Sequence, residues 1–295
     1  MRVAVIGASG FVGRRLAAEL QARGDEVVAV SLRDPAGAAR ACEGAAAIVN
    51  LAGEPVAQRW TAAAKAKIRA SRVDAPGALI DALGALAKPP RIYVSASGVG
   101  YYGRSEEATF DEDSPPGNDF LAEVCVAWEA TAQRAGTFGM RVAIVRTALV
   151  LGSGGGALSK LLPIFKLGAG GPVASGRQWY SWVHIDDLVG IYVHALDGAR
   201  GVFAASAPNP VRNARFTQAL AAAVHRPAIF AVPTFALSAV LGDGAIVLTE
   251  GQRVVPTRTL ASGYRFRFET IDAALEAAVR GETKTGAVGR SSSEG

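Results

Sequence analysis

The 295-residue sequence predicts an α/β protein with a doubly wound parallel sheet and a small C-terminal α+β subdomain. The chain opens with an apolar run that leads directly into a glycine-rich turn, and strand-like and helix-like segments then alternate. From residue 208 the segments become shorter and are punctuated by proline. We therefore expect a nucleotide-binding domain over residues 1–207, with 152–182 contributing to the substrate side. A cover subdomain is expected over 208–280 and a disordered tail over 281–295.

The first 13 residues, MRVAVIGASGFVG, carry the strongest functional signal. Residues 1–6 are typical of a buried strand, and Gly7, Gly10 and Gly13 follow in the spacing G-x-x-G-x-x-G before a helical pattern over 11–20. Glycines here permit a tight turn, close approach of the backbone to a pyrophosphate, and close packing of helix on strand. A glycine-rich turn without a ligand is the alternative. The order of strand, turn and helix favours a dinucleotide site with phosphates at the helix N-terminus.

Further elements follow in alternation, as a parallel sheet requires. Because ligands bind beyond the carboxyl ends of such strands, the candidate loops are 7–13, 31–33, 51–53, 95–103 and 147–156. We expect strands at 26–32, 46–51, 91–96 and 141–150, helices at 61–86 with a break near Pro76, at 120–136 and at 216–224, and a strand entering a helix at 183–196.

The end of the second strand indicates which nicotinamide cofactor is bound. NAD sites place an acidic residue at this point, whereas here Arg33 and Ser31 can hold the 2′-phosphate of NADP. Asp34 is an alternative ribose ligand, but it lies beyond the arginine and precedes Pro35. A solvated loop arginine is the other interpretation of Arg33. We therefore expect NADP(H).

Composition excludes several classes of protein. The net charge of +5 comes from scattered arginines without a basic stripe, so we expect an anionic cofactor and no nucleic acid. Cys42 and Cys125 lie far apart, and no leader is visible, which favours a reducing compartment, the cytoplasm. The longest uncharged apolar run, residues 227–242, contains Pro233 and is too short to span a bilayer, so we expect no membrane partner.

Several motifs resemble one family along nearly the whole chain. The sequence resembles the extended and atypical short-chain dehydrogenase/reductase superfamily, in its NAD-dependent epimerase/dehydratase group. It is most similar there to the "epimerase family proteins", some labelled cell-division-inhibitor-like. The motifs are NLAGEP at 50–55, SR at 71–72, SASGVGYYG at 95–103, WE at 128–129, VLGSGGG at 150–156, SWVHID at 181–186, AP at 207–208 and GQRVVP at 251–256.

The resemblance implies a Rossmann-type domain that binds NADP(H), a small C-terminal domain, and roles for individual residues. Leu51 and Ala52 would lie along the adenosine side, Arg72 and Lys67 near the phosphates or ribose, and Val150 beside the nicotinamide. A surface cation is the alternative for Arg72 and, more strongly, for Lys67. The residues expected at the cofactor are Gly7, Ser9, Gly10, Phe11, Val12, Gly13, Ser31, Arg33, Leu51, Ala52, Gly53, Lys67, Arg72, Ser95 and Val150.

The catalytic groups of the superfamily are missing. Its members use a Tyr-x-x-x-Lys pair, in which the lysine stabilises the phenolate, but Leu121 and Cys125 occupy these positions. Ser97 and Tyr102 are the replacement candidates; a turn serine and a packed aromatic are the alternatives. Tyr101, Glu129 and His184 are weaker candidates, with structural roles as the alternative. Three histidines without ligand spacing predict no metal.

Two functions therefore compete. The first is an NADP(H)-binding oxidoreductase or epimerase that acts on an unknown small molecule with altered catalytic groups. The alternative is a non-catalytic NADP(H)-binding redox sensor or regulatory protein. Superfamily members often form homodimers, which the sequence leaves open.

Overall fold

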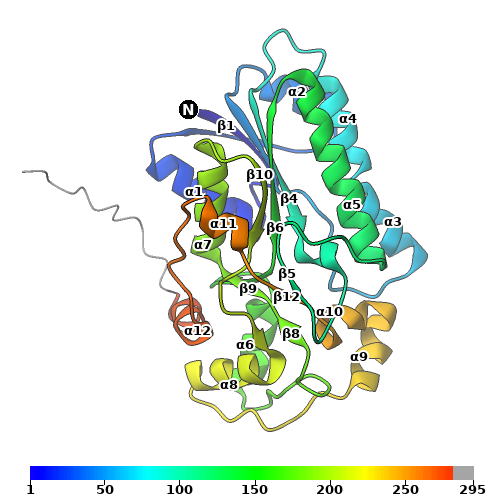
Figure 1. The fold of residues 1–295 in the computed structure, drawn as a ribbon, viewed down its shortest axis with the longest axis vertical. Coiled ribbons are helices and arrows are strands. Elements are labelled where there is room, and N and C mark those ends of the chain that lie inside the picture. The colour runs from blue at the N-terminus through cyan, green and yellow to red at the C-terminus, as the bar shows by residue number, and fades with distance from the viewer. Residues whose placement is uncertain (282–295) are drawn as a thin grey trace, which may run out of the picture.

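A six-stranded parallel sheet forms the centre of the molecule (Figure 1). The structure, a computed structural model, describes residues 1–281, so the tail expected over 281–295 lies outside the described residues apart from Gly281. Across the sheet the strands are β10 (Gly201–Ala205), β6 (Arg141–Thr147), β4 (Ile92–Gly98), β3 (Ala47–Asn50), β1 (Arg2–Ile6) and β2 (Glu26–Val30).

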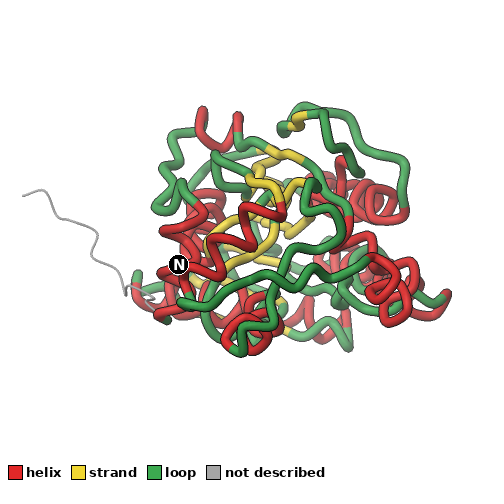
Figure 2. Tube along the Cα trace, turned by 90° about the horizontal axis from the view of Figure 1, so that it is seen from below, coloured by secondary structure: helices red, strands yellow, loops and turns green. Residues whose placement is uncertain are grey.

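Helices cover both faces of this sheet, as expected for a doubly wound fold (Figure 2). Successive residues of β1 serve opposite faces: Val3 and Val5 pack in one core cluster, Ala4 and Ile6 in the other. The first cluster includes α1 (Phe11–Ala22) and α7 (Ile185–Leu196). The second includes α2 (Pro35–Cys42), α4 (Asp74–Leu83) and the end of α5 (Phe120–Gln133). The Rossmann-type fold predicted from the sequence is confirmed.

Strand β1 is the point at which the strand order reverses. It pairs with β2 on one side and with β3 on the other, and Ile6 is in register with Val30 and with Asn50. The carboxyl ends of these three strands therefore meet at one edge. Ligands of open parallel sheets bind in the crevice at such a switch point.

A smaller α+β lobe follows at the other end of the molecule (Figure 1). Its core combines Leu158, Phe165 and Trp182 with Phe216 and Ile271, so residues before 208 contribute to it. The limits of 1–207 and 208–280 stay a prediction. The lobe contains α6 (Leu158–Lys166), α8 (Asn213–Ala223), α9 (Thr234–Leu241), α10 (Ile246–Thr249) and α12 (Ile271–Arg280), with β8 (Trp179–Tyr180) paired to β11 (Val211–Arg212).

Two further strand pairs and one short helix connect the lobes. They are β7 (Leu149–Leu151) with β9 (Trp182–His184), β5 (Thr109–Phe110) with β12 (Arg253–Val254), and α11 (Thr257–Ala261) against β10. The buried Glu112 carboxylate accepts hydrogen bonds from the amides of Ala204 (3.0 Å) and Thr259 (3.0 Å). Asp187 likewise accepts from the amides of Arg267 and Phe268. Because these carboxylates satisfy backbone donors, they fix the C-terminal segments on the sheet.

Three expectations about elements need correction. The helix expected at 61–86 breaks at 71–73 and not at Pro76, which lies in the first turn of α4, where no amide donor is needed. Residues 141–150 form two strands, because the chain leaves the main sheet after Thr147 and joins β9. Helix α2 and strand β10 were not expected; both are short and alanine-rich, so they lack a clear period.

Candidate functional site

The glycine turn after β1 has the geometry of a phosphate-binding loop. Gly7 has φ of +80°, a conformation that side chains disfavour, and its carbonyl accepts a hydrogen bond from Gly10 N at 3.0 Å. A Cβ atom on Gly13 would lie 2.1 Å from the Gly7 oxygen, so only glycine permits this packing of α1 on β1. Helix α1 has Gly10 as its N-cap and no side-chain cap. Its N-terminal amides are thus left for an anion.

Phe11, the first residue of α1, connects this turn to the loop after β7. A Cβ on Gly155 would lie 2.4 Å from the Phe11 ring, and one on Gly156 would lie 3.0 Å from it. The same added Cβ on Gly156 would lie 3.4 Å from the carbonyl oxygen of Val150. The loop expected over 152–156 therefore packs on the phosphate turn, and Val150 lies close to it.

The loop after β3 forms the other wall of the crevice. Leu51 N donates to Ile6 O at 3.0 Å, and a Cβ on Gly7 would lie 3.3 Å from the Leu51 carbonyl carbon. The buried Asn50 accepts from Ala52 N (3.1 Å) and donates to the Tyr93 hydroxyl (3.1 Å), which fixes the loop. Leu51 and Ala52 are half-buried and lie directly beside the glycine turn.

Arg72 lies at the mouth of this crevice with its charge uncompensated. Its guanidinium donates to Ile68 O and Ser71 Oγ, both at 3.3 Å, and lies 5.1 Å from the Trp128 ring centroid. A Cβ on Gly53 would lie 2.9 Å from Arg72 Nη2. Among residues 1–281 no carboxylate lies within 4.0 Å of it, and burial lowers the pKa of Arg72, although the more distant charge of Glu54 acts in the opposite direction. A half-buried cation without an acidic partner is suited to an anionic ligand.

The indole nitrogen of Trp128 adds a second unsatisfied donor. Nε1 is buried and has no hydrogen-bond partner within the described part of the chain. Because protein atoms cover this nitrogen, it is not open to a ligand, and the charge available in the crevice is that of Arg72. The sequence showed the Trp128-Glu129 motif but gave no sign of this donor.

Ser31 and Arg33 lie at the end of β2, where the sequence placed the 2′-phosphate. With Asp34 they line a hollow of about 280 Å³, and Arg33 is exposed. Asp34 is the N-cap of α2, and its carboxylate lies 3.9 Å from Arg40. The side chain makes no capping hydrogen bond, so Asp34 and Arg33 both stay candidates for the ribose end of the cofactor.

Three other predicted cofactor residues are less well placed. Lys67 is exposed on α3 (Ala62–Ala70), with no ion pair within residues 1–281. The Ser95 hydroxyl is buried and donates to Ala96 O at 2.9 Å. The Ser9 carbonyl accepts from Arg14 at 2.6 Å, and this contact fixes the glycine turn. A direct contact of these residues with the cofactor stays a prediction.

The two catalytic candidates belong to one buried network. Ser97 Oγ donates to Glu129 Oε1 at 2.7 Å, and Arg146 donates to both oxygens of Glu129 at 2.8 Å. Arg146 also donates to the Tyr102 hydroxyl at 3.0 Å. Burial raises the pKa of Tyr102 to about 12, although Arg146 acts in the opposite direction. Because both hydroxyls are buried and engaged, this geometry does not favour Ser97 or Tyr102 as proton donors, and their catalytic role stays a prediction.

Arg146 is the residue that sequence reasoning missed. It is a buried charge near the end of an otherwise apolar strand, RVAIVRT, and such a charge requires an acidic partner. That requirement could have pointed to Glu129. Burial lowers the pKa of Arg146, but the hydrogen bonds and charge of Glu129 outweigh this effect and raise it.

Leu121 and Cys125 lie against the end of β4. A Cβ on Gly100 would meet Leu121 Cβ at 3.2 Å, and one on Gly98 would lie 3.8 Å from Cys125 Sγ. Burial raises the pKa of Cys125 to about 11, so the thiol stays protonated at neutral pH. These two side chains fill the space beside the strand with apolar groups.

His184 is a helix cap. Its Nδ1 accepts from Asp186 N at 3.2 Å at the start of α7, and its ring lies 4.0 Å from that of Phe268. The ring is fully buried, and desolvation lowers its pKa to about 4. His184 is thus neutral and structural at pH 7.

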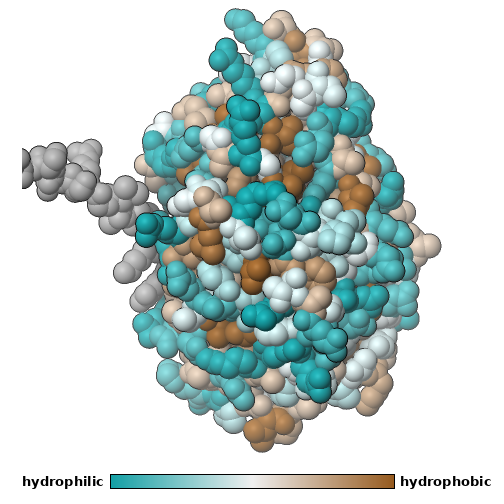
Figure 3. Space-filling view, viewed as in Figure 1, coloured by the Kyte–Doolittle hydropathy of each residue, from teal (hydrophilic) through white to brown (hydrophobic). Residues whose placement is uncertain are grey.

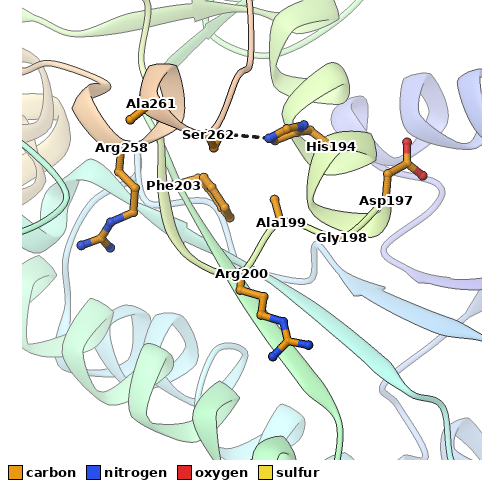
Figure 4. Close-up of a pocket in the computed structure, with 9 residues that line it drawn as sticks. All are labelled: His194, Asp197, Gly198, Ala199, Arg200, Phe203, Arg258, Ala261 and Ser262. Carbon is orange, nitrogen blue, oxygen red and sulfur yellow. Dashed lines mark hydrogen bonds between the residues drawn. The ribbon is translucent and has the colours of Figure 1, made fainter.

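Another hollow lies at the opposite edge of the sheet. It has a volume of about 430 Å³ beside the end of α7 and the start of β10. Figure 4 shows Arg200 and Arg258 extending to opposite sides of Phe203, so their charges do not converge. His194 is held by Ser262 at 2.9 Å. This hollow does not lie at the carboxyl ends of the parallel strands, where the ligands of such sheets bind. We therefore assign the candidate site to the crevice beside β1, β2 and β3.

Comparison with known proteins decides the family. A model of the NAD-dependent epimerase/dehydratase family matches residues 3–204, and a domain of unknown function (DUF1731) matches residues 232–278. The chain belongs to the NAD-dependent epimerase/dehydratase family. Mouse epimerase family protein SDR39U1 is 42% identical over 290 residues, covering 94% of this chain and 99% of that protein. An Arabidopsis thaliana relative, the chloroplastic SDR39U1 homolog, is 41% identical over 302 residues, covering 94% and 86%.

Solved structures of family members agree with this assignment. The crystal structure of human SDR39U1 (isoform 2) with NADPH has a TM-score of 0.90 and 39% identity, covering 95% of this chain and 99% of that one. The small C-terminal domain predicted from the sequence is thus confirmed by the family match. No helix within residues 1–281 has the length and apolarity needed to cross a membrane.

The burial of His184 predicts a pH dependence of stability. Its pKa of about 4 in the folded state lies below the value of about 6.5 in the unfolded chain, so folding favours the neutral ring. This contribution is present above pH 6.5 and is lost as the pH falls towards 4, by up to about 3 kcal/mol. Urea unfolding followed by circular dichroism between pH 7 and pH 4.5 measures it. In the His184→Asn variant, which keeps a capping side chain, we expect this part of the slope to disappear.

The control for this experiment is His225→Asn, because His225 is exposed. Asp186, Asp187, Arg15 and Arg267 face the ring or its cap and are unchanged in both variants. An unchanged slope in His184→Asn would show that the ring does not control acid stability.

Proposed function

We propose that this protein binds NADP(H) in the crevice between β1, β2 and β3, and acts as an oxidoreductase or epimerase on a small molecule. The observation that carries the proposal is the half-buried, uncompensated Arg72 guanidinium beside Gly53, at the same edge as the glycine turn. The NADPH in the structure of the human relative supports it. The residues fit a dinucleotide, because the glycine turn presents the uncapped N-terminal amides of α1 and Arg72 forms no ion pair within residues 1–281.

In this proposal the chain's own residues bind and orient the cofactor, which supplies a hydride when bound. The N-terminal amides of α1 face the pyrophosphate, and Arg33 with Ser31 holds the 2′-phosphate. Arg72 lies over the β3 loop and neutralises phosphate or binds ribose hydroxyls. Leu51 and Ala52 cover the adenosine side, and Val150 borders the nicotinamide.

Tyr101 is the hydroxyl that we propose as the proton donor. Its ring is half-buried and lies 3.4 Å from the Arg146 guanidinium, which Glu129 fixes. Within residues 1–281 its hydroxyl has no hydrogen-bond partner, unlike Ser97 and Tyr102. Arg146 thus places a fixed positive charge beside this hydroxyl-bearing ring, as the lysine does beside the tyrosine in the family pattern.

Compartment and partners complete the proposal. We propose the cytoplasm, because Cys42 and Cys125 are free and buried; the Arabidopsis relative, by contrast, is named as chloroplastic. The expected partner is a small molecule and not nucleic acid. A homodimer stays a prediction from the superfamily.

Substitution of Arg72 tests its contact with the cofactor. Arg72→Gln removes the cation but keeps a polar side chain, so we expect NADPH to bind about 10- to 100-fold more weakly, because charge-assisted hydrogen bonds are lost. Isothermal titration calorimetry measures the affinity. Arg69→Gln is the matched control, since Arg69 lies three residues earlier and is exposed. Equal weakening by both variants, or none by Arg72→Gln, would contradict the assignment.

Substitution of Arg33 tests the preference for NADPH over NADH. Arg33→Ala is expected to weaken NADPH binding about tenfold or more and to leave NADH binding unchanged, because only NADPH carries the 2′-phosphate. The same titration with both nucleotides gives the ratio. Arg40→Ala on α2 is the control. Binding of neither nucleotide by the unmodified protein would overturn the proposed function itself.

One observation favours the second candidate function, a non-catalytic redox sensor. Leu121 has no ionisable group and the buried Cys125 thiol stays protonated at neutral pH, so neither replaces the catalytic pair, and Ser97 and Tyr102 are engaged internally. A sensor must differ between its NADP⁺ and NADPH complexes. Hydrogen exchange of the loop over 152–156 in the two complexes tests this. We expect a difference for a sensor, and identical protection would exclude it.

A further inference from the structure

The most exposed apolar side chains of the molecule are gathered on the small lobe. Five large apolar residues are 60 to 83% exposed, whereas no other large apolar side chain among residues 1–281 exceeds 47%. All five lie in two segments, 164–172 and 226–242. They are Leu167, Ile229, Phe230, Phe235 and Val240.

These two segments run side by side. Phe230 N donates to Gly170 O at 3.2 Å, and Val232 N donates to Pro172 O at 2.8 Å. Arg226 Nε donates to Lys166 O at 3.1 Å. In Figure 1 the chain between α8 and α9 forms the lower end of the molecule, and Figure 3 shows a hydrophobic group protruding there. Leu167, Ile229 and Phe230 therefore lie on adjoining segments at one end of the lobe, and Phe235 and Val240 follow on helix α9.

Helix α9 has an unusual composition for a surface helix. Its eight residues, TFALSAVL, carry no charged side chain, and none of them is buried. A surface helix normally presents polar residues to water, so an exposed apolar helix marks a contact surface.

The two segments 164–172 and 226–242 carry positive charge and no carboxylate. Residues 130–185 and 198–242 contain no aspartate or glutamate. Lys160, Lys166 and Arg226 are exposed and form no ion pair within residues 1–281. We call the five apolar residues with these three cations the apolar–basic face.

We propose that the apolar–basic face binds the surface of a bilayer containing anionic phospholipids. Protruding aromatic and aliphatic side chains insert at the headgroup boundary, and lysine and arginine attract the lipid phosphates. A second copy of the chain fits less well, because a two-fold contact would bring Lys166 and Arg226 of both copies together and neither segment carries a carboxylate. The chain lies on the membrane and does not span it.

This mode of contact differs from the one that the sequence excluded. The expectation of no membrane partner rested on the length of the run over 227–242, which is too short to span. Surface contact needs no such length, because only one face of the segment enters the lipid.

Vesicle flotation of the full chain tests the proposal. We expect binding to vesicles of phosphatidylcholine with about one third phosphatidylglycerol, and little binding to phosphatidylcholine alone. Lys166→Glu combined with Arg226→Glu should weaken binding at least tenfold, and added salt should weaken it too. Phe230→Ser combined with Phe235→Ser should also weaken vesicle binding, because it removes two of the apolar side chains that insert at the headgroup boundary.

Matched controls are Lys88→Glu and Val126→Ser, which change an exposed cation and an exposed apolar residue on the other lobe. Both should bind vesicles like the unmodified protein, and all variants should keep the melting temperature. Equal binding to both vesicle types, or no binding, would overturn the proposal. Light scattering that shows a dimer, dissociated by the Phe230 and Phe235 substitutions, would assign the face to a second copy instead.

Discussion

The close approach of α1 to β1 is the constraint on which the candidate site depends. With no side chain at Gly13, the helix begins directly above the strand end, within contact of the Gly7 carbonyl. This places Phe11 against the glycines at 155 and 156, so the same contact that shapes the phosphate turn also positions the loop from the second half of the chain. A larger residue at position 13 would displace both walls of the crevice at once.

Charge compensation separates structural arginines from those suited to a ligand. Arg146 and Arg15 are buried or half-buried and bind Glu129 and Asp186, so their charges stabilise the fold. Arg33 and Arg72 have no carboxylate within 4.0 Å among the described residues, and of the two Arg72 is the half-buried one. Leaving a half-buried cation unpaired destabilises a protein, and such a group persists where an anion offsets the penalty. The two uncompensated arginines flank the glycine turn at one edge of the sheet.

The sequence predicted those parts of the fold that depend on local patterns. The glycine spacing, the apolar strands and the capped helices each have a short-range signature, and they gave the Rossmann-type sheet and the crevice. The partners of Ser97 and Tyr102 could not be predicted this way. Their hydroxyls meet Arg146 and Glu129, which lie 17 residues apart on a strand and a helix, and only tertiary packing brings them together. Helix α2 was not predicted, because its alanine-rich sequence shows no hydrophobic period.

The same network bears on how the family's chemistry could persist without its tyrosine–lysine pair. At the positions of the tyrosine–lysine pair, Leu121 lies against the glycine at 100 and Cys125 against the glycine at 98. A lysine ammonium at position 125 would lose its hydration there, because that position is buried. The cation nearest to a free phenol is instead Arg146, 3.4 Å from the Tyr101 ring. Unlike lysine, a guanidinium held by Glu129 keeps its charge when buried. In the proposed site the positive charge therefore comes from strand β6 and not from helix α5, and the proposed hydroxyl comes from the turn that follows β4.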